Sequence, residues 1–423
     1  MDRTPALPVS ASAQVTLQGD PPARTQRWLV ATTEYAGLTA YTGGIGRHYA
    51  ALLPALVRQG VEVDLMVFSD AAPRVDARLH GVRLVSFERT AHTSQIGVLF
   101  GRARRVRAAY ERGLYDRVFM PEWSALGAAL PPGAPLLTNL ATSAKLANQI
   151  SGLRLRHLPR ARVVPVALQI RREARQIRRS AGLISISTAM TNRVTSMLAG
   201  TPPVAVVRNC IDVEDVRRAS INAPLPASWP GEADPIVLFL GRSERRKGVI
   251  EAVQAFGHLD NPRAHLVLAG AGGDARFEPT RAELLAPLSP ASRERVTWLG
   301  HVPGDELYRA IRAATVAMCP SRWEGFGNVA LEVKAIGTPL IVTSGSGFDD
   351  FCTDGEDCLM VPPADSSQLA HALRVLLDSP DLANELAHRA SERVADFAPD
   401  PVAADLIGAA DRLLGRPPHR ERG

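Results

Sequence analysis

The sequence predicts an α/β protein with two domains, each built around a parallel sheet. Short apolar runs that are typical of buried strands alternate with longer helical segments through both halves of the chain, which indicates repeated βα units. The length of 423 residues exceeds what one hydrophobic core usually holds. A proline-rich stretch at residues 222–235 separates the halves and favours a connector between two domains.

The expected elements follow the same pattern in both halves. In the first half we expect strands at residues 28–33, 61–68, 82–87, 117–120, 136–140, 182–187 and 204–208. In the second half we expect strands at residues 236–240, 264–269, 296–299, 315–319, 339–343 and 358–361. The division that follows is a mobile segment 1–26, an N-terminal domain 27–212, a linker 213–235, a C-terminal domain 236–398, a last helix 399–416 and a tail 417–423.

The composition favours a protein of the cytoplasm. Apolar residues make up 46% of the chain, which is ample for two cores. No run approaches the roughly 18 uninterrupted apolar residues of a membrane span. Pro5, Pro8 and Asp20 stand where a signal peptide would need an apolar stretch. The four cysteines show no pair spacing typical of a metal site, so buried thiols are expected.

Two carboxylates lie close together where an apolar strand, residues 315–319, turns through glycines into a helix. Glu324 falls in the turn and Glu332 inside the helix. Such a turn opens at the carboxyl end of the sheet, where free N–H groups and the helix dipole attract anions. Carboxylates beside an anion site suit hydroxyl groups, whereas taken alone they could be solvated surface acids. A sugar nucleotide would supply both the diphosphate and the hydroxyls.

A basic loop at residues 241–248 follows a strand upstream of these acids. Arg242 and Lys247 bracket the loop. A forked arginine and a point-charge lysine together suit a diphosphate, and each charge-assisted bond contributes roughly 1.5–3 kcal/mol. Only three lysines, the other two being Lys145 and Lys334, occur among the 49 basic residues. A lysine in this loop therefore indicates a specific role for its point charge.

These two segments belong to a wider resemblance. Six segments of the C-terminal half resemble motifs of the family 4 glycosyltransferases, in the order of that family: residues 241–248, 268–272, 299–302, 320–327, 337–340 and 354–362. The N-terminal half is less similar, with matches at residues 34–36, 42–46 and 121–123. The family consists of retaining enzymes of the GT-B fold. The resemblance, over residues 28–415, therefore implies two Rossmann-like βαβ domains that face each other across a cleft, with the last helix packing back on the N-terminal domain.

The resemblance also implies which residues act. Catalytic roles fall on Arg242 and Lys247, which would stabilise the leaving diphosphate, and on Glu324, which would bind hydroxyls of the donor sugar. The implied donor-binding residues are Gly43, Gly44, Gly46, Gly241, Val302, Phe326, Gly327, Asn328 and Glu332, the last for the ribose diol. The acceptor-side residues are Glu34, Tyr35, Glu122 and Thr142.

By the same resemblance the reaction uses no metal, no cofactor and no protein nucleophile. The donor is a UDP- or GDP-linked sugar whose leaving phosphate accepts the proton of the acceptor. The sequence also lacks an Asp-x-Asp pair in a turn after a strand, the site that many metal-dependent transferases use. Asp349 and Asp350 are adjacent acids beneath the expected donor site. We interpret them as turn or helix-cap residues, with donor contact as the alternative.

One position departs from the family pattern. Ala141 stands where relatives commonly have a histidine that faces the transferred sugar. Its absence implies a different or smaller donor sugar, or a substitute such as Thr142. The alternative is a nucleotide-sugar-binding protein with lost or altered activity. An epimerase of the same architecture would need an acid and a base in the cleft, and no such pair emerges from the sequence.

The net charge of +6 hides a local bias. Nine arginines against one acid, Glu173, fall in residues 154–179, and those within residues 166–180 repeat at helical spacing. This basic stripe suits anionic headgroups at the inner face of the membrane, or it is a solvated face. The expected acceptor is a small molecule, a saccharide or a lipid. Nucleic acid is not expected, because aromatic residues are only 5% and do not interleave with the arginines.

Overall fold

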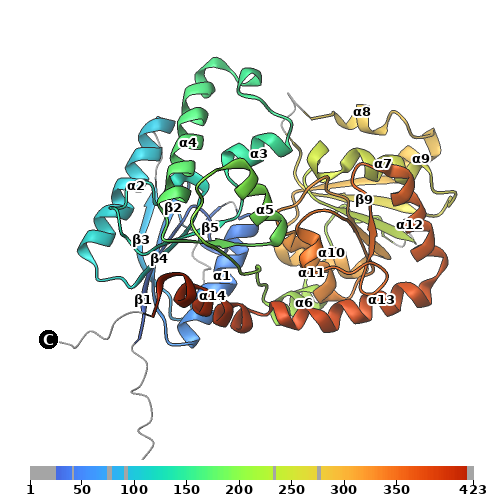
Figure 1. Ribbon diagram of the computed structural model, residues 1–423. Helices are drawn as coiled ribbons and strands as arrows, with labels where there is room; N and C mark the ends of the chain where they lie inside the picture. The colour runs from blue at the N-terminus through green and yellow to red at the C-terminus, as the bar shows by residue number, and fades with distance from the viewer. Residues whose placement is uncertain are drawn as a thin grey trace, which may run out of the picture.

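The computed structural model describes residues 25–40, 42–73, 79–89, 94–231, 235–273 and 278–416. The expected N-terminal segment, up to residue 24, and the expected tail 417–423 lie outside these residues. Within them the chain forms two α/β domains that lie side by side (Figure 1). Each domain has its own parallel sheet, so the predicted fold class is confirmed.

The N-terminal domain is built on seven described strands in the order β3-β2-β1-β4-β5-β6-β7. They are β1 (Arg27–Thr32), β2 (Glu62–Ser69), β3 (Arg83–Arg89), β4 (Arg117–Pro121), β5 (Leu136–Leu140), β6 (Gly182–Ser185) and β7 (Val204–Val206). The helices are α1 (Gly44–Arg58), α2 (Gln95–Arg112), α3 (Ala144–Ile150), α4 (Arg160–Arg179) and α5 (Thr188–Met197). Apolar clusters pack α1 and α2 on opposite faces of the sheet, which explains why the inner strands are continuously apolar.

The C-terminal domain repeats this plan with six described strands in the order β10-β9-β8-β11-β12-β13. They are β8 (Ile236–Leu240), β9 (His265–Ala269), β10 (Val296–Gly300), β11 (Val316–Cys319), β12 (Leu340–Thr343) and β13 (Leu359–Val361). The helices are α7 (Val249–Gly257), α8 (Arg281–Leu285), α9 (Pro290–Glu294), α10 (Gly304–Ala313), α11 (Asn328–Ile336), α12 (Ser366–Asp378) and α13 (Pro380–Arg393). In both sheets the strand order reverses beside the first strand, so a crevice opens there at the carboxyl edge.

Two helices connect the domains. The helix α6 (Val213–Asn222), capped by Asp212, falls in the expected linker and packs against α10 and α11. The last helix, α14 (Pro399–Leu414), lies along α1 and against β6 and β7, so the chain returns to the first domain (Figure 1). Gly182 permits this contact, because a Cβ there would lie 2.9 Å from the Leu413 side chain.

The two domains also share apolar packing at their junction. One buried cluster joins Leu140, Ile186 and Met190 of the first domain to Phe326 and Phe348 of the second. No helix within the described residues is long and apolar enough to cross a membrane. The four cysteines, all inside the described ranges, are buried free thiols, as expected.

Candidate active site

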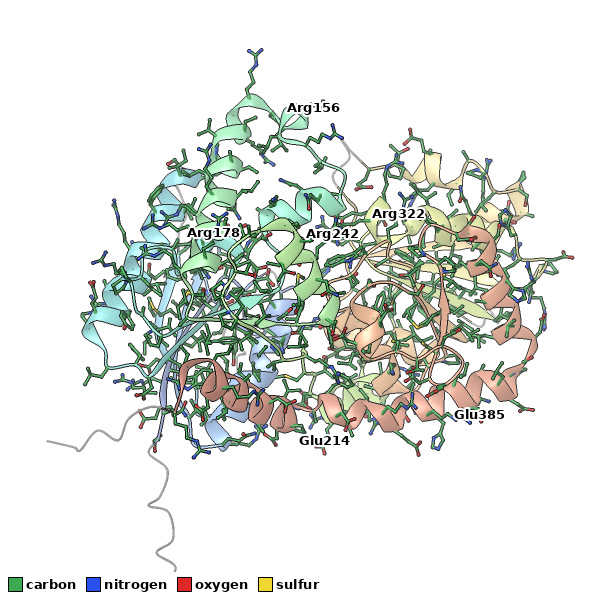
Figure 2. The ribbon with its side chains drawn as sticks, viewed as in Figure 1. Arg156, Arg178, Glu214, Arg242, Arg322 and Glu385 are labelled. Atoms are coloured by element: carbon green, nitrogen blue, oxygen red, sulfur yellow. The ribbon has the colours of Figure 1, made fainter. Side chains whose placement is uncertain are left out.

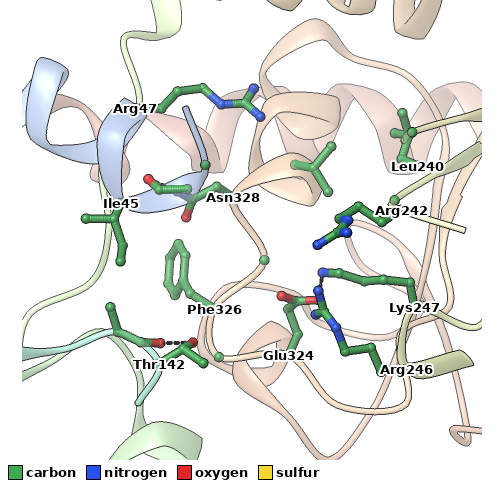
Figure 3. A pocket seen from close by; sticks show the side chains of 18 of the residues that line it. Ile45, Arg47, Thr142, Leu240, Arg242, Arg246, Lys247, Glu324, Phe326 and Asn328 are labelled. Carbon is green, nitrogen blue, oxygen red and sulfur yellow. Dashed lines mark hydrogen bonds and ion pairs between the residues drawn. The ribbon is translucent and has the colours of Figure 1, made fainter. Parts of the chain in front are cut away.

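A cavity of about 720 Å³ lies between the two domains. Its N-terminal wall consists of loops that follow β1, β5 and β6, and its C-terminal wall of loops that follow β8, β9, β10 and β11. Every one of these loops leaves the carboxyl end of a parallel strand, where open α/β sheets bind their ligands. Figure 3 shows charged side chains of the C-terminal wall turned toward this space.

Glycines bring the loops of the C-terminal wall together. Gly248 adopts a φ of 74°, and a Cβ there would lie 1.9 Å from the carbonyl oxygen of Pro320. The basic loop therefore packs directly on the segment that carries Glu324. Gly270, with a φ of 153°, is equally close to the carbonyl oxygen of Gly241. A side chain at either position would push the loops apart.

Lys247 and Glu324 form an ion pair in the cavity wall. The Lys247 Nζ lies 2.5 Å from Glu324 Oε2, and the two side chains are only 16% and 18% exposed (Figure 3). Burial by itself opposes ionisation of this carboxyl, but Lys247 and Arg246 outweigh it and hold the pKa of Glu324 below its ordinary value. The wall therefore presents a fixed anion beside a fixed cation.

Two arginines flank this pair. Arg242 Nε lies 3.0 Å and Arg246 Nε 2.7 Å from the carboxylate oxygens of Glu244, a largely buried side chain. Arg242, whose side chain is 47% exposed, and Arg246 both line the cavity. Glu244 aligns the two guanidinium groups from one side, so their remaining donors are available for a second anion. The sequence analysis did not single out Arg246, although it adjoins Lys247 in the same loop.

The turn before α11 depends on Gly327. Its φ of 100° is left-handed, and a Cβ there would lie 2.2 Å from the Phe348 ring. Phe326 packs on Phe351 with ring centroids 4.7 Å apart. Phe326, Gly327 and Asn328 all line the cavity, so the first residue of α11 faces it together with the turn.

Asn328 bridges the two domains. Its Nδ2 donates to the carbonyl oxygen of Gly44 over 3.0 Å, and its Oδ1 accepts a hydrogen bond from Asn209 Nδ2 at 2.9 Å. The side chain thus contacts the start of α1 rather than leaving its amide open to a ligand. Asn209, which also lines the cavity, was missed by the sequence analysis because no local motif marks it.

Glu332 does not lie in the cavity wall of this structure. Its side chain is 1% exposed, and Oε1 lies 2.8 Å from Arg47 NH1, which reaches across from α1. Burial raises the pKa of Glu332, and Arg47 and Tyr308 only partly offset this. The carboxylate expected to bind ribose is therefore held by an arginine that itself lines the cavity.

The glycine loop of the N-terminal wall is held by Glu34. Oε2 of this side chain accepts a hydrogen bond from the Gly43 N–H at 2.7 Å, so that donor is already engaged. Burial raises the pKa of Glu34 despite its bonds to Gly43 and Gly46. Glu34, Gly43 and Gly44 line the cavity. Tyr35, expected on the acceptor side, is instead fully buried in the N-terminal core.

Two buried glutamates support the loop after β5. Glu122 Oε2 accepts from the Ala141 N–H at 2.9 Å, and Glu173 Oε2 accepts from the Ala144 N–H at 2.7 Å. Burial raises the pKa of Glu122 to about 8 and that of Glu173 to about 7. Thr142 lines the cavity, but its hydroxyl donates to the Ala141 carbonyl within the loop (Figure 3). Glu122 thus lies behind the wall and Thr142 in it.

The remaining predicted residues divide between cavity and scaffold. Gly241 and Val302 line the cavity, as does His301. Asp349 accepts from the Gly345 N–H, and Asp350 accepts from the N–H and the hydroxyl of Thr188 at the start of α5. Both acids bind backbone, as the cap interpretation expected, and Asp350 joins the two domains.

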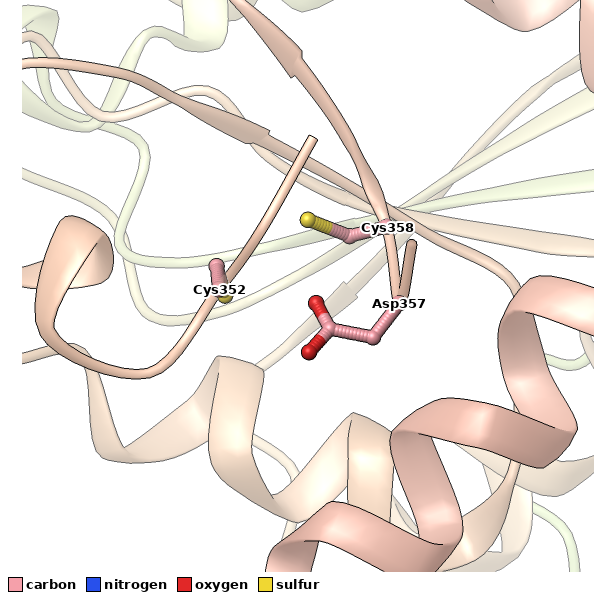
Figure 4. Close-up of side chains that lie close together, drawn as sticks. All are labelled: Cys352, Asp357 and Cys358. Carbon is pink, nitrogen blue, oxygen red and sulfur yellow. The ribbon is translucent and has the colours of Figure 1, made fainter. Parts of the chain in front are cut away.

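One buried cluster combines a carboxylate with two thiols, which are residue types that bind metal ions. Atoms of Cys352, Asp357 and Cys358 lie within 4.8 Å of one another in the interior (Figure 4). Asp357 Oδ2, however, already pairs with Lys334 Nζ at 2.9 Å and with Arg393 NH1 at 3.1 Å. A metal ion would have to displace these cations, so the cluster does not fit a metal centre.

Family models match both walls of this cavity. Residues 42–215 match the model described as Glycosyltransferase Family 4, and residues 227–393 match the model described as Glycosyl transferases group 1. A D-inositol 3-phosphate glycosyltransferase of Salinispora tropica is 31% identical over 342 residues, which cover 77% of this chain and 68% of that protein. The chain belongs to the family 4 glycosyltransferases.

Other proteins are similar over nearly the whole chain. A glycogen synthase of Mycobacterium tuberculosis is 28% identical over 407 residues, 88% of this chain and 91% of that protein. Among solved structures, the sucrose-phosphate synthase of Thermosynechococcus elongatus has a TM-score of 0.72 at 21% identity, covering 92% of this chain and 99% of that one. Anabaena HepE, solved with UDP-glucose, has a TM-score of 0.66 at 16% identity and covers 91% and 99%. These likenesses confirm the GT-B fold.

Proposed function

We propose that this glycosyltransferase moves a sugar from a nucleoside diphosphate sugar to a hydroxyl acceptor, with retention of the anomeric configuration and without a metal. The observation that carries the proposal is the Lys247–Glu324 pair, set in a cavity that Arg242 and Arg246 also line. Three cations suit a diphosphate, and the Glu324 carboxylate beside Lys247 suits sugar hydroxyls. A nucleotide sugar carries both groups in one molecule.

The donor would lie along the C-terminal wall. Its diphosphate would contact Arg242, Lys247 and the N–H groups of residues 326–328 at the start of α11, where the helix dipole favours negative charge. Its sugar would then meet Glu324. His301 and Val302, at the end of β10, would border the base. The UDP-glucose of the HepE structure is a precedent for such a donor in a protein of the same fold.

The reaction would break the bond between the anomeric carbon and the diphosphate oxygen. As this bond breaks, negative charge grows on the phosphate, and Arg242 and Lys247 would stabilise it. The acceptor oxygen would bond to the anomeric carbon on the same face, which gives retention, and its proton would pass to the departing phosphate oxygen. The products are the glycosylated acceptor and a free nucleoside diphosphate. No protein nucleophile is required.

The charges in the cavity support a reaction without a metal. Lys247, Arg242 and Arg246 provide the positive charge that a divalent cation supplies elsewhere. The carboxylates that line the cavity are already engaged, Glu34 by a backbone N–H and Glu244 and Glu324 by cationic side chains. The proposal therefore assigns the role of the metal to the basic loop.

The test is a calorimetric titration with UDP, GDP, ADP and their glucose conjugates, with EDTA present throughout. We expect one nucleotide to bind the wild type and to lose most of its affinity for the Lys247→Ala variant. Proton NMR of the product would then read the anomeric configuration directly. Binding that requires added Mg²⁺, or an inverted product, would contradict the corresponding part of the proposal.

A lipid acceptor at the inner face of the membrane, in a cytoplasmic enzyme, is a second candidate. The outer part of the N-terminal domain carries exposed arginines of α4, with Val164 62% exposed beside them. Arg156 and Arg178 mark the two ends of this region (Figure 2). Basic side chains with an exposed apolar residue suit an anionic bilayer.

Vesicle co-sedimentation tests this candidate. Vesicles with phosphatidylglycerol should retain the protein, and pure phosphatidylcholine vesicles should not. The double variant Arg171→Glu, Arg175→Glu should lose the binding, since both side chains are exposed on α4. Equal recovery with both kinds of vesicle would leave a soluble saccharide or small molecule as the acceptor.

A further inference from the structure

One ion pair crosses from the N-terminal domain to the donor half of the cleft. Arg47, in the first turn of α1, places NH1 2.8 Å from Oε1 of Glu332 in α11. The two residues are 285 positions apart in the chain. Arg47 lines the cavity, whereas Glu332 is not among the lining residues and has only 1% of its side chain exposed. Figure 3 shows the guanidinium of Arg47 extended toward the C-terminal wall.

The second oxygen of this carboxylate, Oε2, is buried and makes no hydrogen bond to a described residue, although Tyr308 lies near Glu332 and with Arg47 partly offsets the effect of burial on its pKa. A buried carboxylate oxygen in that state costs free energy unless another donor reaches it. This oxygen, beside the expected donor site, can accept a hydrogen bond from a hydroxyl group. A ribose diol, as part of the donor, would supply one.

We propose that Arg47 is a positioning residue for the donor: by holding the Glu332 carboxylate from across the cleft, it completes the ribose end of the donor site only when both domains are assembled. The inference rests on the proposed function, because it takes the ribose of a nucleotide as the partner of Glu332. It adds a residue of the N-terminal domain to a site that otherwise belongs to the C-terminal one.

Neighbouring contacts fix the same pair of elements. Asn328, the first residue of α11, donates to the Gly44 carbonyl at the start of α1. The starts of the two helices are thus joined by two contacts, Asn328 with Gly44 and Glu332 with Arg47. Without Arg47 the carboxylate loses its charged partner in a buried place, where an isolated carboxylate is strongly disfavoured. It would then take up a proton or turn away, and either change would weaken its bond to a hydroxyl.

The experiment compares UDP, GDP and ADP with their 2′-deoxy analogues, by calorimetry, on three proteins. For the nucleotide that binds the wild type, we expect a clear preference over the deoxy analogue. Arg47→Ala should bind it about tenfold more weakly and lose that preference. Without Arg47 the Glu332 carboxylate is no longer oriented, and the charge-assisted hydrogen bond from the ribose hydroxyl to this carboxylate is lost. Arg58→Ala is the matched control, since Arg58 lies on the same helix in an exposed ion pair with Asp400. It should behave as the wild type.

The outcomes separate two failures. If the wild type binds none of UDP, GDP and ADP, the proposed function is overturned and this inference with it. Binding by the wild type, with an unchanged 2′-hydroxyl preference in Arg47→Ala, would overturn this inference alone. If Arg47→Ala does not fold, Arg47→Lys decides, because a single ammonium should restore part of the preference and a purely structural role would not alter discrimination between two nucleotides. In steady-state assays the expected change is in the donor KM, with kcat affected less.

Discussion

The two walls of the cavity use their polar side chains in opposite ways. On the C-terminal wall, Lys247, Arg242 and Glu324 bring charges to the cavity from one basic loop and one turn. On the N-terminal wall, Glu34 and Thr142 are engaged within their own domain. Glu34 binds the Gly43 N–H, and the Thr142 hydroxyl binds the Ala141 carbonyl.

Under the proposed function, this difference assigns stabilisation of the leaving group to the C-terminal wall and the shape of the acceptor site to the N-terminal wall. A charged wall can stabilise a diphosphate as it leaves, because its charges are fixed before the substrate arrives. A wall whose polar groups are satisfied presents apolar surface and backbone, and under the proposed function it would select the acceptor by fit. Arg47 and Asn209 are exceptions: Arg47 brings a charge of the N-terminal domain to Glu332, and Asn209 donates a hydrogen bond to Asn328.

The largest expected effect breaks the charged wall. Lys247→Ala and Glu324→Ala should each lower kcat/KM by about two to three orders of magnitude, because each removes a charge that acts on the reacting groups. Steady-state kinetics with the identified donor, alongside melting curves, measure this. Arg245→Ala is the control in the same loop, where the side chain is exposed and outside the cavity wall. Wild-type kinetics in both active-site variants would refute the site.

A second effect compares glycines of the two walls. Gly270→Ala should lower the free energy of unfolding by about 2–3 kcal/mol, since its φ is left-handed and its Cβ would meet the Gly241 carbonyl. Gly44→Ala should change it by less than about 1 kcal/mol, because the new Cβ would meet only the Asn328 side chain, at 3.2 Å, and no backbone atom. Urea denaturation of both variants checks the difference. Equal losses would mean that the two walls are equally tightly packed.

A third effect concerns pH. Burial raises the pKa of Glu122 from 4.5 to about 8, so the folded protein binds more protons than the unfolded chain between these values. The free energy of unfolding should therefore fall as pH rises through this window. Glu122→Gln should remove part of the fall, seen as a shallower dependence of the melting temperature on pH.

For Glu324 of the C-terminal wall, the pH dependence of the free energy of unfolding should have the opposite sign. Because the pKa of Glu324 is lowered, its contribution to stability is present above the ordinary pKa of 4.5 and is lost only in more acid solution. Glu324→Gln should therefore leave the slope above about pH 5.5 unchanged. Equal flattening of the slope by both substitutions would contradict the contrast between the walls.

The smallest effect is expected at Thr142. Thr142→Val removes a hydroxyl that donates to the neighbouring Ala141 carbonyl rather than to the cavity. We expect kcat/KM within about threefold of the wild type and a loss of roughly 0.5–1.5 kcal/mol in the free energy of unfolding. A loss of activity beyond tenfold would show that Thr142 binds substrate and that the N-terminal wall is not limited to shape.

Much of the fold and the C-terminal wall was predictable from the sequence. The alternation of apolar runs and helices specifies two parallel sheets, because burial on both faces requires continuously apolar strands. Arg242, Lys247, Glu324 and the Gly-Phe-Gly turn are close in sequence to the strands that place them, so local order already brings them to one edge. Arg246 lies in the same loop, but that it turns toward the cavity and pairs with Glu244 is visible only in the structure.

Tertiary structure alone decided the rest. Packing between segments far apart in the chain decides three features of the site. Arg47 holds Glu332, Tyr35 is buried in the core, and Glu122 lies behind the wall. Sequence periodicity tells which face of an element is apolar, but it does not tell which distant donor reaches a buried carboxylate. Such pairing is fixed only when the sheets, α1 and α11 come together, because a buried charge takes whichever partner the packing brings to it.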